Sequence, residues 1–252
     1  MSNRNLRRES FCLALVLGLG AFGCSVEPSA DEGDANEEET SESTDALFSG
    51  NVGQAVSATC STTSVHGLSV QIIHEMGCIT PNTLEKLPSR PNLVLGPAVF
   101  PYLVPHARDE LVKTLEAHPG TTMHINSMFR TVAQQYLLYS WYESGRCGIG
   151  LAAHPGMSNH ETGLAIDVSE TSTWRGSLEN HDFNWFGSSD PVHYDFGGAS
   201  GDRGLDVKAF QRLWNANHPG DKISVDGSYG PQTEARLKKA PASGFAIGST
   251  CG

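Results

Sequence analysis

The stretch from Ser158 to Val168 constrains the fold more than any other part of this 252-residue chain. From Gly163 onward its residues alternate with the period of two that is typical of a β-strand. The core face of that strand is Leu164, Ile166 and Val168. The opposite face is Gly163, Ala165 and Asp167. The second face is nearly bare except for one carboxylate, so we expect room there for a metal and a substrate.

A second alternating run at residues 192–196 supplies a further candidate ligand. His193 and Asp195 lie on one face of this predicted strand, opposite Val192, Tyr194 and Phe196. His160, in the turn before the first strand, together with Asp167 and His193, gives three ligands and one open position, the pattern of a catalytic zinc site. Asp190 is the predicted general base, which takes a proton from water and later delivers it to the leaving amine. Asp195 is the reserve candidate for that role.

These residues resemble a known family. The motif S-x-H-x-x-G-x-A-x-D is complete, and an acidic residue stands three positions before His193. The pattern resembles the zinc D-alanyl-D-alanine carboxypeptidases and endopeptidases of the VanY and VanX type, over roughly residues 85–197. The resemblance implies an α+β fold with a small antiparallel sheet and helices, like the Hedgehog domain. It also implies Zn²⁺ on His160, Asp167 and His193, with Asp190 as the base. Many relatives have Glu at the position of Asp190 and Trp at that of Val192.

The segment Ser127–Thr131 resembles the Ser-x-x-Arg-Ser element of the same family. By this resemblance, Arg130 binds a substrate carboxylate or the oxyanion with its planar fork. The alternative is a surface arginine in an ion pair. Ser158 and Gln135 are candidate substrate contacts, although Ser158 can equally shape its turn. Helical spacing predicts helices over residues 105–118 and after Arg130.

The N-terminal region predicts export. Arg4, Arg7 and Arg8 precede a short apolar run at residues 11–22, and the sequence Ala21-Phe22-Gly23-Cys24 resembles a lipobox. Residues 1–24 are therefore predicted to be a lipoprotein signal peptide with the lipid on Cys24; a plain secretory signal is the alternative. The protein would then be lipid-anchored in the bacterial cell envelope, on the periplasmic side or at the outer membrane, or secreted.

An acidic segment follows the signal. The net charge is −11, and nine acidic residues with no Lys or Arg lie between Cys24 and Leu47. Such a composition cannot bury enough apolar surface to fold, so residues 25–57 are predicted to be a disordered linker. The remaining residues are only mildly acidic, and no basic stripe indicates nucleic-acid binding.

Four cysteines remain after the predicted signal, and in an exported protein they favour two disulfides. They are Cys60, Cys78, Cys147 and Cys251. Four cysteines allow three connectivities, and the sequence does not choose among them. Cys251 is a candidate to attach the C-terminal tail to the catalytic part.

Residues 202–252 follow a glycine-rich break and have their own pattern, distinct from the predicted peptidase domain at residues 58–198. They resemble the small helical peptidoglycan-binding domains, through Gln211, Leu213, Asp226, Gly227, Tyr229, Gly230 and Thr233. A helical cap without a ligand is the alternative.

The predicted peptidase domain and the predicted C-terminal domain both indicate peptidoglycan as the polymer that the protein acts on. The sequence predicts a monomeric zinc peptidase that hydrolyses D-Ala-containing bonds of peptidoglycan stems, as a carboxypeptidase or an endopeptidase. The alternative is a non-catalytic wall-binding lipoprotein that uses the zinc fold as a scaffold.

Overall fold

The computed structural model describes residues 48–249 and Cys251. The α-helices of this part are α1 (Val52–Ala58), α2 (His66–Ile79), α3 (Pro105–Glu116), α4 (Val132–Glu143), α5 (Thr171–Glu179), α6 (Leu205–Asn217) and α7 (Pro231–Leu237). Two 3₁₀ turns are η1 (Thr62–Val65) and η2 (Asn159–Thr162). The strands are β1 (Glu85–Lys86), β2 (Leu93–Leu95), β3 (Tyr102–Leu103), β4 (Met123–Ser127), β5 (Ala165–Val168), β6 (Phe183–Trp185) and β7 (His193–Phe196). The predicted α+β class is confirmed.

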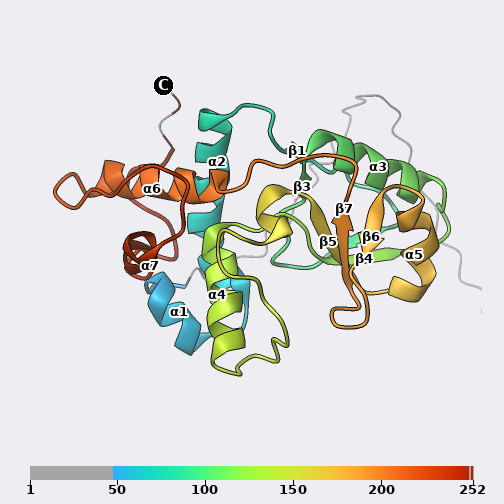
Figure 1. Cartoon of the computed structure of the whole chain (residues 1–252), viewed down its shortest axis with the longest axis horizontal. Helices are drawn as coiled ribbons and strands as arrows, with labels where there is room; N and C mark the ends of the chain where they lie inside the picture. The colour runs from blue at the N-terminus through green and yellow to red at the C-terminus, as the bar shows by residue number, and fades with distance from the viewer. Residues whose placement is uncertain (1–47, 250, 252) are drawn as a thin grey trace, which may run out of the picture. The chain divides into compact units, whose positions relative to one another are not determined.

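A five-stranded sheet in the order β2-β4-β5-β7-β6 forms the centre of one half of this fold (Figure 1). The expected antiparallel pairing holds for β4-β5, β5-β7 and β6-β7, whereas β2 and β4 are parallel. Helices α3 and α5 pack with the sheet around a core that includes Ile166, Val168 and Tyr194. The two predicted strands therefore exist as β5 and β7. Of their predicted core-facing residues, Ile166, Val168, Tyr194 and Phe196 are buried as expected, whereas Leu164 and Val192 precede the strands and are only partly buried.

A second core lies among the helices α1, α2, α4, α6 and α7 (Figure 1). Fully buried Leu68 from α2, Leu137 from α4 and Phe210 from α6 belong to it together. The predicted domain boundary between residues 198 and 202 therefore does not divide the hydrophobic core, because helices on both sides of that boundary bury their apolar faces against one another. The C-terminal helices form one compact unit with the other described residues, from residue 48 onward.

The predicted disordered linker ends earlier than expected. It was assigned to residues 25–57, but α1 begins at Val52, and both Val52 and Ala55 are completely buried. Asn51 caps this helix, since its side chain accepts a hydrogen bond from the Gln54 amide at 2.8 Å. The burial of these two apolar residues and the capping box give this segment a defined structure. The acidic composition of the residues before it did not predict this helix. The predicted signal peptide, Cys24 and residues 25–47 lie outside the described residues.

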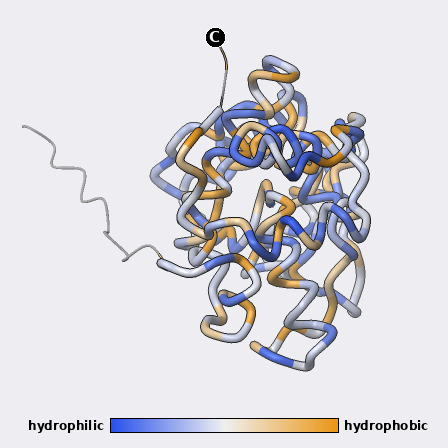
Figure 2. The backbone as a smooth tube through the Cα atoms, turned by 90° about the vertical axis from the view of Figure 1, so that its left-hand side faces the viewer, coloured by the Kyte–Doolittle hydropathy of each residue, from blue (hydrophilic) through white to orange (hydrophobic). Residues whose placement is uncertain are grey.

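Two disulfides fix the connectivity that the sequence left open. Cys60 pairs with Cys147, and Cys78 in α2 pairs with Cys251. The second bridge attaches the C-terminal tail to α2. Hydrophobic and hydrophilic stretches alternate at short intervals along the backbone (Figure 2), and none of the helices within the described residues is long and apolar enough to cross a membrane.

Candidate metal centre and adjoining cavity

The turn before β5 positions His160 through a network of capping hydrogen bonds. Ser158 caps η2 by accepting a hydrogen bond from the His160 amide at 3.3 Å. Glu161 completes a capping box, because its carboxylate accepts from the backbone amides of Ser158 at 3.0 Å and Gly156 at 2.8 Å. Gly163 ends the turn at φ +70°, where an added Cβ would lie 2.5 Å from the Leu84 side chain. This geometry accounts for the serine and the glycine of the motif.

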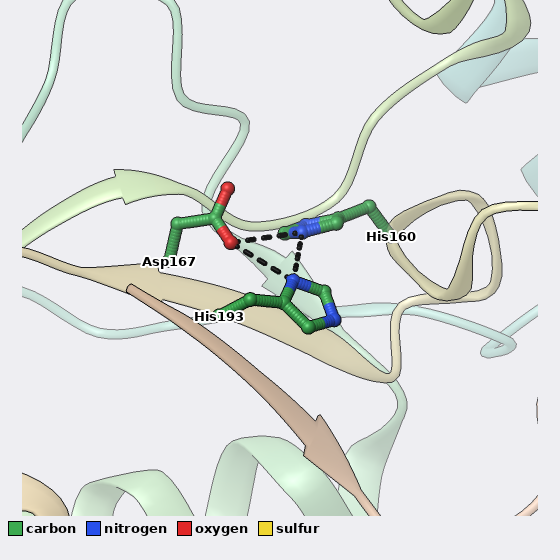
Figure 3. A group of neighbouring side chains, drawn as sticks. All are labelled: His160, Asp167 and His193. Carbon is green, nitrogen blue, oxygen red and sulfur yellow. Dashed lines mark hydrogen bonds and ion pairs between the residues drawn. The ribbon is translucent and has the colours of Figure 1, made fainter. Parts of the chain in front are cut away.

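His160, Asp167 and His193 converge on one point (Figure 3). The register of β5 and β7 places Asp167 directly opposite His193. Asp167 Oδ1 lies 3.2 Å from His160 Nε2 and 3.0 Å from His193 Nδ1, and those two nitrogens are 3.1 Å apart. The three residues predicted from the sequence as ligands are therefore brought together, on two neighbouring strands and the turn that precedes one of them.

The hydrogen bonds of the outer ring nitrogens of the two imidazoles determine whether the converging nitrogens present a lone pair or a proton. His160 Nδ1 donates to the Met128 carbonyl oxygen at 2.7 Å, and His193 Nε2 donates to Asp195 Oδ1 at 2.9 Å. In their neutral forms, both rings therefore direct a lone pair toward the Asp167 carboxylate. Three lone pairs about 3 Å apart repel one another unless a cation lies between them.

The donor set fits zinc. Four ligands at about 2.0–2.1 Å around a tetrahedral zinc ion lie about 3.3 Å from one another, and the three separations here are 3.0, 3.1 and 3.2 Å. Two nitrogens and one carboxylate oxygen match the ligand types that zinc prefers, and three protein ligands leave a fourth position open.

The pKa values of the three side chains are shifted by the same close approach of their nitrogen and oxygen atoms. Burial alone would lower the pKa of His193, but hydrogen bonds to Asp167 and Asp195 outweigh it and raise the pKa to about 9. Burial and the nearby Arg130 guanidinium lower the pKa of His160. Burial opposes ionisation of Asp167, but the charges of His160 and Arg130 hold the pKa of its carboxyl well below the usual value. Without a metal, a proton on His193 takes the place of the cation.

A chain of hydrogen bonds supports His193 from outside the cluster. Asp195 Oδ1 also accepts from Asn159 Nδ2 at 2.9 Å, and Asn159 Oδ1 accepts from Arg203 Nη2 at 2.7 Å. Carboxylates that hold the outer nitrogen of a ligand histidine fix its tautomer and orientation. Asn159 and Arg203 are not among the residues predicted from the sequence, and Asp195 is predicted only as a reserve base.

Arg130 lies beside the cluster, in the short connection between β4 and α4. Its Nη2 forms an ion pair with Asp167 Oδ2 at 2.5 Å, and its Nε donates to Ser127 Oγ at 2.7 Å. The guanidinium also lines the cavity next to the cluster. Both predicted alternatives are therefore present in part, since Arg130 is in an ion pair and still borders the space that a substrate would enter.

The cavity has a volume of about 190 Å³ and opens onto two of the candidate ligands, His160 and His193. Its polar lining includes Arg130, Ser158, Asp190 and Asp195, together with His160 and His193. Asp190 is half-buried, and burial together with the neighbouring Asp167 charge raises the pKa of its carboxyl. Asp195 is occupied by His193 and Asn159, whereas the Asp190 carboxylate has no hydrogen-bond partner in the described part of the chain.

Some expectations about the site need correction. Gly163 and Ala165 were expected to leave room for substrate, but neither lines the cavity; Gly163 serves the turn and Ala165 is completely buried. Gln135 is also completely buried, and its Nε2 donates to the Ala153 carbonyl at 2.7 Å. Gln135 therefore lies beneath the loop at residues 151–158 and supports this loop through its hydrogen bond, but it does not face the cavity.

The fold and the site define a mixed α+β domain with a His-Asp-His group suited to a single metal ion. Comparison with family models gives a more particular result: residues 103–194 match the VanY family of D-alanyl-D-alanine carboxypeptidases. The expected resemblance is thereby confirmed for this segment. The match contains the five fixed residues of the first motif, Asp190 and His193, and ends before Asp195. A search among curated proteins found no match.

Proposed function

We propose that the protein is a zinc-dependent peptidase that hydrolyses D-Ala-containing peptide bonds in the stems of bacterial peptidoglycan. The observation that carries this proposal is the convergence of His160 Nε2, Asp167 Oδ1 and His193 Nδ1 beside a cavity that holds a free carboxylate. The VanY-type domain supports D-alanyl-D-alanine as the substrate class.

A zinc ion held by these three atoms would supply Lewis acidity, which makes a water molecule nucleophilic and stabilises negative charge on a peptide carbonyl. Asp190 takes the proton of the attacking water and returns it to the leaving amine. It is a better base than Asp195 because its carboxylate is free, while Asp195 Oδ1 accepts two hydrogen bonds. Arg130 keeps the outer oxygen of Asp167 occupied and presents positive charge to a substrate carboxylate or to the developing oxyanion.

Export and anchoring belong to the same proposal. We infer that residues 1–24 direct the chain across the membrane, that Cys24 carries the lipid, and that the protein acts in the cell envelope. The two disulfides support this, because such bridges persist in oxidising compartments.

The test uses purified peptidoglycan and defined muropeptides, with mass spectrometry of the released fragments. We expect loss of terminal or cross-linking D-Ala, abolished by a chelator and restored by zinc. Asp190→Asn should bind zinc as tightly as the wild type but lose at least about 100-fold in rate, whereas Asp202→Asn, a surface change outside the cavity, should retain activity. Bound zinc with an unchanged wall would contradict the proposal and favour a non-catalytic wall-binding protein.

A further inference from the structure

A second cavity lies beside the candidate active site, between α4 and α7. Its volume is about 190 Å³, below the roughly 300–1,000 Å³ of pockets that enclose drug-sized ligands. Its lining comprises Tyr136, Tyr139, Glu143, His154, Tyr229 and Glu234, with Ser140 and Lys238. Three tyrosines, one histidine and several charged groups therefore surround a space for a single ring-sized ligand.

The aromatic side chains form a continuous wall. The His154 ring meets Tyr139 edge-on at 5.1 Å between ring centroids, and it meets Tyr229 in the same way at 5.3 Å. Tyr139 comes from α4, His154 from the 151–158 loop, and Tyr229 from the turn before α7. The wall is therefore built from three separate segments, and neither the matched domain nor the C-terminal helices contain it alone.

Polar groups are also available around this wall. The Tyr229 hydroxyl is buried and has no hydrogen-bond partner among the described residues, and such groups cost stability unless something satisfies them. Glu143 is exposed on the next turn of α4 after Tyr139. Lys238 pairs with Glu234 at 2.5 Å and lies 5.9 Å from the Tyr136 ring centroid. This ammonium already occupies the cationic position near the Tyr136 ring, so a second cation there would be repelled.

The two cavities lie on either side of the same backbone segment. Ala153 lines the candidate active site and His154 lines the second cavity, although adjacent Cα atoms are only about 3.8 Å apart. Gly156, in the same loop, approaches Tyr229 so closely that an added Cβ would lie 3.1 Å from the Tyr229 Cβ. An extended peptide covers about 3.3–3.6 Å per residue, so a stem of four residues, about 14 Å long, can connect two such neighbouring sites.

We propose that this cavity binds one pyranose ring of the glycan strand whose peptide stem enters the candidate active site. An aromatic wall suits the C–H face of a sugar ring, while the exposed Glu143 carboxylate suits its hydroxyl and amide groups. This inference rests on the proposed function, because the proposed function identifies peptidoglycan as the polymer that is bound. It assigns Tyr139, Tyr229 and Glu143 to sugar binding and predicts that sugar-bearing stems are preferred over free peptides.

The test measures binding directly, so that it does not depend on turnover. The probe is the disaccharide of N-acetylglucosamine and N-acetylmuramic acid without its peptide. Its binding is measured by calorimetry and by the shifts of the backbone amide NMR signals around His154. Wild-type protein should bind it, and Tyr139→Ala should weaken binding about tenfold, the effect of losing one aromatic contact. Glu143→Gln should weaken it as well. The matched control is Tyr142→Ala, an exposed tyrosine on the same helix that does not line the cavity, and it should bind like the wild type.

A second measurement compares hydrolysis of a disaccharide-pentapeptide with that of the free pentapeptide. Tyr139→Ala should lose the preference for the sugar-bearing substrate without slowing hydrolysis of the free peptide. No binding by the wild type, equal binding by Tyr139→Ala and Tyr142→Ala, or binding of an α-blocked lysine in place of the disaccharide would overturn the proposal. A protein that binds the disaccharide but cleaves neither substrate would contradict the proposed peptidase activity and leave the sugar site supported.

Discussion

His193 is held through both ring nitrogens, and the outer contact is the one that fixes its role. Because Asp195 accepts the Nε2 proton at 2.9 Å, the Nδ1 lone pair is directed toward His160 and Asp167. Removing the Asp195 carboxylate frees the ring to rotate and to exchange tautomers. We therefore predict that Asp195→Ala lowers zinc affinity about 10–100-fold with little change in thermal stability, measured by competition with a coloured chelator. Asp202→Ala is the control, and equal affinity of the two variants would show that Asp195 does not orient the ligand.

The raised pKa of His193 makes the metal-free protein sensitive to pH. The pKa is about 9 in the fold and near the ordinary 6.5 in the unfolded chain, so protonation favours the folded state. This stabilisation is complete below about pH 6.5 and is lost as the pH rises through about 9, with an upper limit of about 3 kcal/mol. We expect the free energy of unfolding of the metal-free protein to fall across this window, measured with urea. In His193→Gln the decline should be absent, and a flat wild-type profile would contradict the assignment.

At the scale of elements, local patterns predicted the site well because its ligands lie on two short strands and one turn. Alternation alone assigned Asp167 and His193 to the faces that they occupy in β5 and β7. The role of Arg203 could not be predicted, because its hydrogen bond to Asn159 joins residues 44 positions apart. Ala165 was misjudged for a similar reason: whether a small side chain borders a cavity or packs in the interior depends on segments that the strand does not contain.

Helix α6 shows what the C-terminal segment contributes to the fold. Phe210 is completely buried, and its ring lies 6.5 Å from Trp214 and 6.3 Å from Phe245. Truncating a buried phenylalanine removes its contacts and leaves a cavity, so Phe210→Ala should lower the free energy of unfolding by about 3–5 kcal/mol. Urea unfolding measures this, with exposed Tyr142→Ala as the comparison. A loss below about 1 kcal/mol would mean that α6 packs only loosely on the other helices.

At the scale of the whole molecule, the motif residues of the C-terminal segment hold its own turn together. Gln211 Oε1 accepts from the amides of Asp226 and Gly227, and Gln211 Nε2 donates to Asp226 Oδ1 at 3.0 Å. This network accounts for the Gln and Asp-Gly parts of the resemblance by structure rather than by ligand binding. Wall binding by residues 202–252 therefore remains a proposal, and the tyrosine of the motif, Tyr229, is its most direct candidate for a ligand contact.

The hydrophobic core shared by the helices also determines whether the predicted peptidase domain, residues 58–198, can fold without the C-terminal helices. Leu68 and Leu137, both completely buried, belong to the same cluster as Phe210 and Leu237, so a chain that ends at residue 198 would expose this apolar surface. Such a chain would also lose the Cys78–Cys251 bridge and the hydrogen bond from Arg203 to Asn159.

We predict that the chain truncated after residue 198 shows no cooperative thermal transition and binds an apolar dye, whereas the intact chain unfolds in a single transition. Differential scanning calorimetry and dye fluorescence measure both properties. Phe210→Ala, which weakens the same core without removing it, should keep a cooperative transition but with a lower melting temperature than the intact wild type. A truncated chain that melts cooperatively near the intact value would show that the sheet half and α4 are stable without the C-terminal helices, and the division predicted between residues 198 and 202 would then be a true domain boundary.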